Sequence, residues 1–236
     1  MAGTIRGSFT IRRASADLPA FDDETSLEVV SSLGTEGSQI CDFQFGDVSV
    51  RTLEVRNLRL LSGKIRAVQA GRASITGARI DSVEFTGCDL SSLRWTGGKI
   101  SRARFDTCRL LGARFEGVTL QHAVFTGCKL DYSAFDQARA AGPVIFAGCS
   151  LREAEFTGCD LTGSLFDDCD LRLAGFGPGS YRGCDLRGND LSAISGVHHL
   201  KNVVIDHAQT IQLAQALAAE LDVTFGDDLS DRPEQP

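Results

Sequence analysis

Residues 154–163 read AEFTGCDLTG, which is two successive five-residue units of the same form. Each unit starts with a small residue (Ala154 or Cys159), continues with an acidic residue and then Phe156 or Leu161, and ends in Thr-Gly. A period of five fits neither the 3.6 residues per turn of an α-helix nor the two-residue alternation of an ordinary strand. The stretch therefore predicts a repeat architecture.

The same period runs through most of the chain. Every fifth residue from Ile40 to Ala140 is apolar or aromatic, and the series resumes from Phe146 to Leu191 after one extra residue near Gly142-Pro143. Only 42% of the chain is hydrophobic, so composition does not account for an unbroken series. We interpret the extra residue as a bulge on one face, with a small functional loop as the alternative. Glycines often stand two residues after the central position, where a corner turn needs an unusual φ: Gly77, Gly87, Gly97, Gly117, Gly127, Gly158 and Gly163.

These units, with Cys88-Asp89-Leu90-Ser91-Ser92, resemble the pentapeptide-repeat family. Its motif is a small residue, a polar residue, Leu or Phe, and two mostly polar residues. The resemblance covers about residues 38–196. It implies an all-β fold, a right-handed quadrilateral β-helix of nearly eight coils, with four pentapeptides per turn and the Leu/Phe and small residues pointing inward.

Four pentapeptides per turn would stack residues 20 apart at about 4.8 Å, the spacing of neighbouring strands. The stacking predicts two facing aromatic columns with aliphatic columns between them. The members of the aromatic columns are Phe45, Ile65, Phe85, Phe105, Phe125, Phe146, Phe166 and Leu186 on one side, and Val55, Ile75, Trp95, Phe115, Phe135, Phe156 and Phe176 on the other.

The period divides the chain into four parts. Residues 1–37 are expected to form an N-terminal cap, in which residues 26–33 are either a strand or a helical turn over the first coil. Residues 38–196 form the β-helix, residues 197–225 an exit segment with a helix, and residues 226–236 a disordered acidic tail. Asp206 is predicted to cap the helix, with Gln209 completing a capping box.

The predicted helix is apolar over most of its circumference, so it needs cover on two sides. One side can lie on the last coil. The other predicts a homodimer, with simple capping of the coil as the alternative. The residues expected at this dimer helix are Ile211, Ala214, Leu217, Ala218 and Leu221.

Catalysis and cofactors are not expected. Seven of the eight cysteines fall at the small inward position, where Cys serves as a small buried apolar residue, and no CxxC spacing for a metal occurs. His198-His199 lies in the exit segment, where neighbouring strand residues would point to opposite faces. A solid interior leaves no substrate cavity. The sequence therefore predicts a non-enzymatic protein without a cofactor.

Charge is distributed unevenly along the predicted rod. The net charge is −7, but residues 42–140 hold more basic than acidic residues, and residues 141–236 the reverse. In the stacking model, Arg59, Arg79, Lys99 and Arg139 form one outward stripe, interrupted by Thr119. Charges that merely keep a rod soluble are one interpretation, and a docking surface for an acidic partner is the other.

The favoured function is a protein-binding adaptor or scaffold in the cytoplasm, with an unknown partner. No apolar run suits a signal peptide or a membrane span, and the overall acidity disfavours nucleic acid. The alternative comes from the resemblance to the quinolone-resistance pentapeptide proteins, dimers that bind DNA gyrase and imitate DNA. In this chain only the last coils could imitate phosphates, through Asp160, Asp167, Asp168, Asp170, Asp185 and Asp190.

Overall fold

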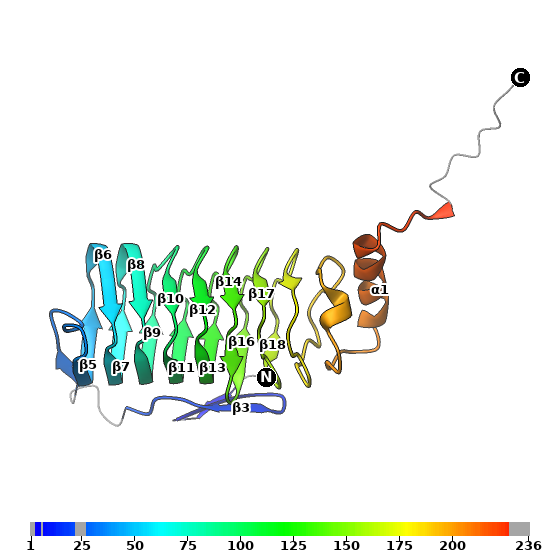
Figure 1. The fold of residues 1–236 in the computed structure, drawn as a ribbon. Coiled ribbons are helices and arrows are strands. Elements are labelled where there is room, and N and C mark those ends of the chain that lie inside the picture. Colours follow the sequence, from blue (N-terminus) through cyan, green and yellow to red (C-terminus); the bar gives the residue numbers. More distant parts are fainter. Residues whose placement is uncertain (1–2, 6, 22–26, 227–236) are drawn as a thin grey trace, which may run out of the picture.

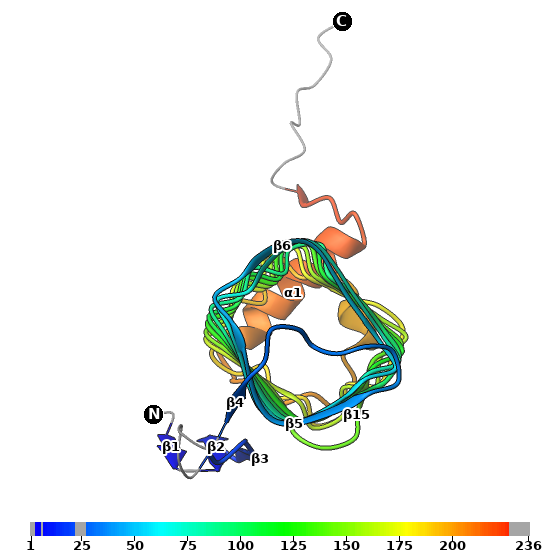
Figure 2. The same cartoon turned by 90° about the vertical axis from the view of Figure 1, so that its left-hand side faces the viewer.

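The computed structural model describes residues 3–5, 7–21 and 27–226. Two parallel sheets form a four-sided coil, which Figure 1 shows from the side and Figure 2 along its axis. The first sheet contains β4 (Glu28–Val29), β5 (Gln39–Gly46), β7 (Arg59–Arg66), β9 (Arg79–Thr86), β11 (Lys99–Asp106), β13 (Thr119–Thr126), β15 (Arg139–Ala140), β16 (Val144–Ala147) and β18 (Leu165–Asp167). The second contains β6 (Ser49–Arg56), β8 (Gln69–Thr76), β10 (Arg94–Thr96), β12 (Arg114–Glu116), β14 (Ala134–Asp136), β17 (Glu155–Thr157) and β19 (Gly175–Phe176).

The strand register confirms the parallel β-solenoid. Ile65 pairs with Phe85, and Trp95 with Phe115, each 20 residues further along the chain. The second sheet contributes one strand to each of about seven turns, and isolated bridges continue the coil to Val204.

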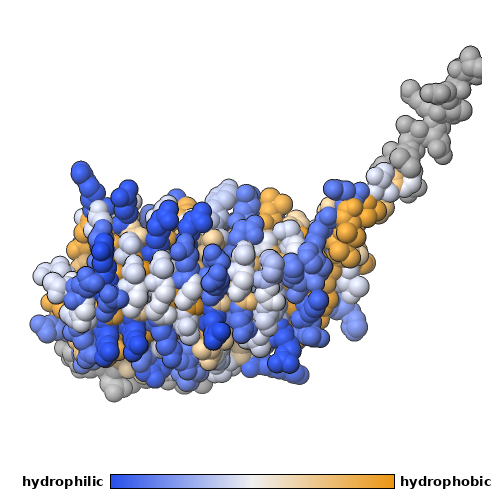
Figure 3. All heavy atoms as spheres, in the orientation of Figure 1, coloured by the Kyte–Doolittle hydropathy of each residue, from blue (hydrophilic) through white to orange (hydrophobic). Residues whose placement is uncertain are grey.

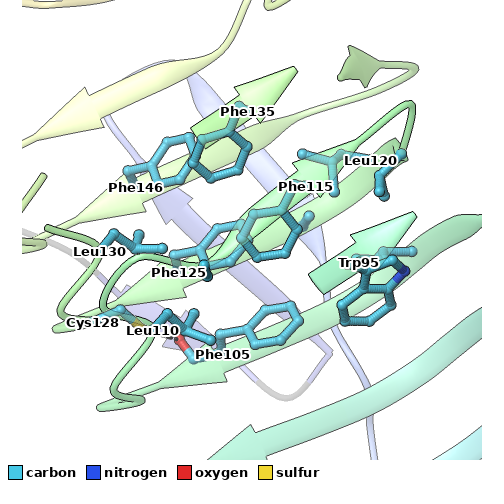
Figure 4. Close-up of a cluster of buried hydrophobic side chains, with 14 of the residues drawn as sticks. Trp95, Phe105, Leu110, Phe115, Leu120, Phe125, Cys128, Leu130, Phe135 and Phe146 are labelled. Carbon is cyan, nitrogen blue, oxygen red and sulfur yellow. Dashed lines mark hydrogen bonds between the residues drawn. The ribbon is translucent and has the colours of Figure 1, made fainter. Parts of the chain in front are cut away.

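The interior contains the predicted columns (Figure 4). Phe105 and Phe125 stack with ring centroids 4.7 Å apart and planes within 8°. Rings of the two facing columns meet edge to face, as Phe115 and Phe125 do at 6.3 Å. Both arrangements are favoured by aromatic quadrupoles. Tyr181 is buried among the aliphatic positions, and its hydroxyl lies 3.0 Å from both the Phe156 and the Gly177 carbonyl oxygens, which share its one hydrogen.

The chain turns its corners with residues of positive φ. All seven glycines predicted at corners have φ between 58° and 71°. Non-glycine residues adopt the same conformation at other corners, such as Ser82 at 58° and Leu173 at 59°. The coil therefore sets the corner geometry, and glycine only lowers the conformational free energy that a positive φ costs.

The extra residue near Gly142-Pro143 is confined to one corner. Thr119 pairs with Arg139 at a separation of 20, whereas Val124 pairs with Ile145 at 21. The insertion lies between β15 and β16, and the inward columns continue past it. It is the bulge expected from the sequence.

The N-terminal segment differs from the expected cap. Strands β1 (Gly3–Ile5), β2 (Ser8–Ile11) and β3 (Ala14–Asp17) form an antiparallel sheet that lies along the outside of the coil (Figures 1 and 2). Its apolar side chains pack on outward-facing residues of β13, β16 and β18. Only the following residues reach the first coil, where β4 pairs with β5 and Leu33 joins the main core.

At the other end, α1 (Gln209–Glu220) follows a 3-10 turn (Val197–His199). The predicted cap at Asp206 is wrong, because Ala208 occupies the N-cap position and the Asp206 carboxylate accepts a hydrogen bond from the Gly188 N–H. Gln209 does accept from the Asp206 N–H at 2.7 Å. Its amide group also donates to the Leu186 and Asn189 carbonyls, closing the last coil. The predicted acidic tail, apart from Gly226, lies outside the described residues.

Candidate protein-docking surface

The basic stripe exists as a continuous column on the first sheet. Arg59 pairs with Arg79, and Arg79 with Lys99, on neighbouring parallel strands. Thr119 follows in the same column and then Arg139, which bridges to Asp160. The register therefore places the four expected basic residues in one column, which is interrupted at Thr119 as predicted and is followed by Asp160.

The four cations of the stripe are exposed. Within the described ranges, none of Arg59, Arg79, Lys99 and Arg139 forms an ion pair. Other arginines of the coil do, as Arg102 does with Asp81 at 2.5 Å. Cations at strand spacing repel one another. An acidic ligand placed along the column would relieve that repulsion.

A shallow open groove of about 660 Å³ follows the stripe. Arg59, Arg79 and Lys99 line it together with apolar atoms of Leu61 and Ile80. The groove offers three positive charges and a limited apolar surface, and its lining also includes Asp81, which pairs with Arg102. Such a surface suits an acidic segment of a protein better than a buried small molecule. Figure 3 shows how polar side chains cover the coil on one face.

Three of the six acidic DNA-mimic candidates are paired with arginines. Asp170 is held by Arg172, whose guanidinium keeps the pKa of that carboxyl below its usual range. Asp167 pairs with Arg12 at 2.9 Å. Burial opposes ionisation of Asp185, but hydrogen bonds from Arg187 outweigh it, and its pKa is lowered.

The remaining three candidates are Asp160, Asp168 and Asp190. Asp190 accepts a hydrogen bond from the Ser192 N–H at 2.9 Å, which lowers its pKa. Asp160 accepts one from the Thr162 N–H at 3.2 Å. With half of the six carboxylates paired with arginines, the last coils do not present the dense negative charge of a duplex.

The predicted dimer face of α1 is open to solvent. Ile211 is 70% exposed, Leu221 65% and Leu217 37%, and Ala214 is exposed as well. Ala218 is half-buried, while Ala216 and Gln209 face the coil. Apolar side chains gather at this end of the molecule in Figure 3, in contrast to the polar coil.

The seven cysteines at the small inward positions are all buried. Cys108 and Cys128 direct their thiols at the Phe85 and Phe105 carbonyls of the preceding coil, at 3.5 and 3.4 Å. Desolvation raises the pKa of Cys159 to about 11 and that of Cys184 to about 12. Both thiols are therefore protonated at neutral pH and unreactive.

The expectation that His198 and His199 point to opposite faces is wrong. Because residues 197–199 form a 3-10 turn, the rings of His198 and His199 lie 3.8 Å apart. His198 contacts the Glu220 carboxylate and so ties the turn to α1. The described part of the chain holds no cluster of three or more metal-ligating side chains. Within the same ranges, no helix has the length and apolar character needed to span a membrane.

Comparisons with known proteins point to the same repeat. Residues 98–176 match the family model described as "Pentapeptide repeat region". A search of curated proteins finds no match.

Solved structures of similar fold include a trypsin-treated variant of QnrB1, described as a plasmid-mediated fluoroquinolone resistance protein. It is 17% identical over 77% of this chain and 98% of its own, with a TM-score of 0.33. The pentapeptide repeat protein Rfr23 from the cyanobacterium Cyanothece 51142 is 16% identical over 57% and 88%, also with a TM-score of 0.33. HetL from the cyanobacterium Nostoc sp. strain PCC 7120, involved in heterocyst differentiation regulation, is 15% identical over 73% and 89%, with a TM-score of 0.27.

Together with the five-residue period and the four-sided coil, the match to the family model shows that residues 98–176 form a pentapeptide repeat region.

Proposed function

We propose that this chain is a non-enzymatic adaptor or scaffold that binds an acidic segment of a partner protein along its basic stripe. The observation that carries the proposal is the in-register column Arg59, Arg79 and Lys99, which lines one groove and has no carboxylate partner among the described residues. The solid apolar interior supports a binding role, since the coil places its polar groups on the outside. Complementary charge would guide the partner to the groove and fix its register.

Affinity capture with purified protein tests this proposal. The variant Arg59→Glu/Arg79→Glu/Lys99→Glu should lose a partner that the unaltered chain retains. The matched control Arg51→Glu/Arg94→Glu/Arg114→Glu makes the same charge change at exposed arginines of the second sheet. It should keep the partner. Equal capture by both triple variants would remove the stripe as the docking surface.

We further propose that the chain is a homodimer joined through α1. The exposed side chains of Ile211, Leu217 and Leu221 support this, because one apolar helix face lies on the coil and the other lies open. Two copies related by a twofold axis would each cover the face of the other. The resulting particle would present two basic stripes to its partner.

A DNA-mimicking modulator of DNA gyrase remains the alternative function. The pairing of Asp167, Asp170 and Asp185 with arginines weighs against it. Gyrase supercoiling assays decide the matter. Inhibition, or protection from quinolone-induced cleavage, would favour the mimic over the adaptor, and the absence of both would end it.

A further inference from the structure

One outward column of the coil changes from polar to apolar residues where the N-terminal hairpin lies. The column reads Gln44, Lys64, Glu84 and Arg104, then Val124, Ile145 and Leu165, and then Asp185. The three apolar members face away from the coil interior, so the stacked core does not require them. Without cover they would form an exposed apolar strip on an otherwise polar face.

The hairpin formed by β2 and β3 (residues 8–18) supplies that cover. Phe9 and Ile11 of β2 and Ala16 of β3 alternate with polar residues and, together with Leu18, face the coil. Val124 and Ile145 beneath them are fully buried, and Leu165 is 2% exposed. The strip therefore behaves as a docking surface whose shape fits an antiparallel hairpin with alternating apolar side chains.

The hairpin is attached to the coil rather than built into it. Its strands pair only within the N-terminal sheet β1–β3, and no backbone-to-backbone hydrogen bond among the described residues joins the hairpin to β13, β16 or β18. The polar contacts use side chains instead. At one end the Asp17 N–H donates to His122 Nδ1 at 2.9 Å.

Arg12, in the hairpin turn, forms the contacts at the other end. Its guanidinium lies 2.9 Å from the Asp167 carboxylate and 3.3 Å from that of Asp185, and it donates to the Arg187 carbonyl at 2.9 Å. The Arg12 side chain is 28% exposed, so water and salt weaken these pairs. A small apolar contact with partly exposed ion pairs opens at a lower free energy than the stacked coil does.

We propose that the strip Val124–Ile145–Leu165 is a second protein-docking surface, filled in the free protein by the chain's own N-terminal hairpin as a replaceable occupant. The partner that fits it is a β-hairpin with apolar side chains at alternating positions and an arginine at its turn. The covalent tether between hairpin and coil keeps the hairpin at a high effective concentration near the strip. The strip therefore stays covered until a competing hairpin displaces the chain's own hairpin.

The test uses the full chain with a specific protease site introduced between Asp22 and Glu24, and a fluorescent synthetic peptide of residues 1–21 as the probe. After cleavage the tether is lost, and the peptide should exchange onto the coil with a rise in anisotropy. The uncleaved chain should bind the peptide at least about tenfold more weakly. Arg12→Ala in the uncleaved chain should raise the binding towards that of the cleaved chain.

Two variants keep the result specific. Ile145→Asp in the cleaved chain should abolish peptide binding, whereas Leu173→Asp, at a 59% exposed apolar position on another corner, should not. A peptide carrying Arg12→Ala should bind the cleaved chain several-fold more weakly than the unaltered peptide does. This comparison requires no substitution in the coil. A cleaved chain that keeps its β-sheet circular dichroism and takes up no peptide would overturn the proposal.

Discussion

Phe125 and Phe146 stack with ring centroids 4.9 Å apart although 21 residues separate them, one more than separates the neighbouring pair Phe105 and Phe125. The added residue is absorbed at the corner between β15 and β16. The aromatic column thus passes the insertion without a gap, which indicates that the stacked core dictates the register and the corners adapt to it.

Shortening a member of this column should destabilise the coil strongly. Phe125 is fully buried between two stacked rings and beside an edge-on ring. Phe125→Ala should lower the free energy of unfolding by about 3–5 kcal/mol. Urea denaturation followed by circular dichroism measures the change. Tyr132→Ala, at a side chain that is 63% exposed, serves as the control and should cost less than about 1 kcal/mol.

Two neighbouring glycines should respond differently to alanine. A Cβ on Gly98 would lie 2.1 Å from the Ala78 carbonyl oxygen, whereas a Cβ on Gly97 would meet nothing within 4 Å. Both have positive φ, so each pays the left-handed cost of about 1–2 kcal/mol. Gly98→Ala should cost at least a further ~1 kcal/mol from the clash with backbone. Thermal unfolding of the two variants checks this, and equal melting temperatures would refute it.

The sequence reveals the interior of the coil but not the place of the N-terminal hairpin. The inward positions follow one five-residue rule, so both aromatic columns and the corner glycines could be read directly. The hairpin's location could not, because it depends on contacts between Phe9 or Ile11 and residues more than 100 positions away. The signal was present in the outward residues Val124, Ile145 and Leu165, which a search restricted to every fifth residue passes over.

The wrong prediction of a helix cap at Asp206 has a related cause. Asp206 matched a capping pattern, but its carboxylate meets the Gly188 N–H of the preceding coil. A local pattern cannot reveal such a competing tertiary partner. The basic stripe was predictable because the position of each member follows from the repeat alone, and the register places Arg59, Arg79 and Lys99 side by side as expected.

Acid should loosen the last coils. The folded-state pKa values of Asp170, Asp185 and Asp190 are lowered. Their stabilisation is therefore present above the unfolded pKa of about 3.9 and is lost as the pH falls through the lower folded values. The urea midpoint should drop between about pH 5 and pH 2. Asp185→Asn should reduce the drop, and an unchanged pH profile in that variant would contradict the assignment of this contribution to Asp185.

The exposed face of α1 gives a prediction about mass. Leu217→Glu places a charge in the proposed contact between two copies, so the particle should fall from a dimer to the 25.3 kDa monomer. Light scattering coupled to gel filtration measures the mass. Leu173→Glu, which changes an exposed leucine away from α1, should leave a dimer. A Leu217→Glu protein of unaltered mass would exclude dimerisation through this helix.

Docking of the partner through the basic stripe is best tested by the Kd of the captured partner, measured by fluorescence anisotropy. The variant Arg59→Glu/Arg79→Glu/Lys99→Glu should bind at least about tenfold more weakly, and added salt should weaken binding to the unaltered chain. Arg51→Glu/Arg94→Glu/Arg114→Glu should change Kd less than about threefold. Equal Kd values for the unaltered chain and the stripe variant would contradict the account.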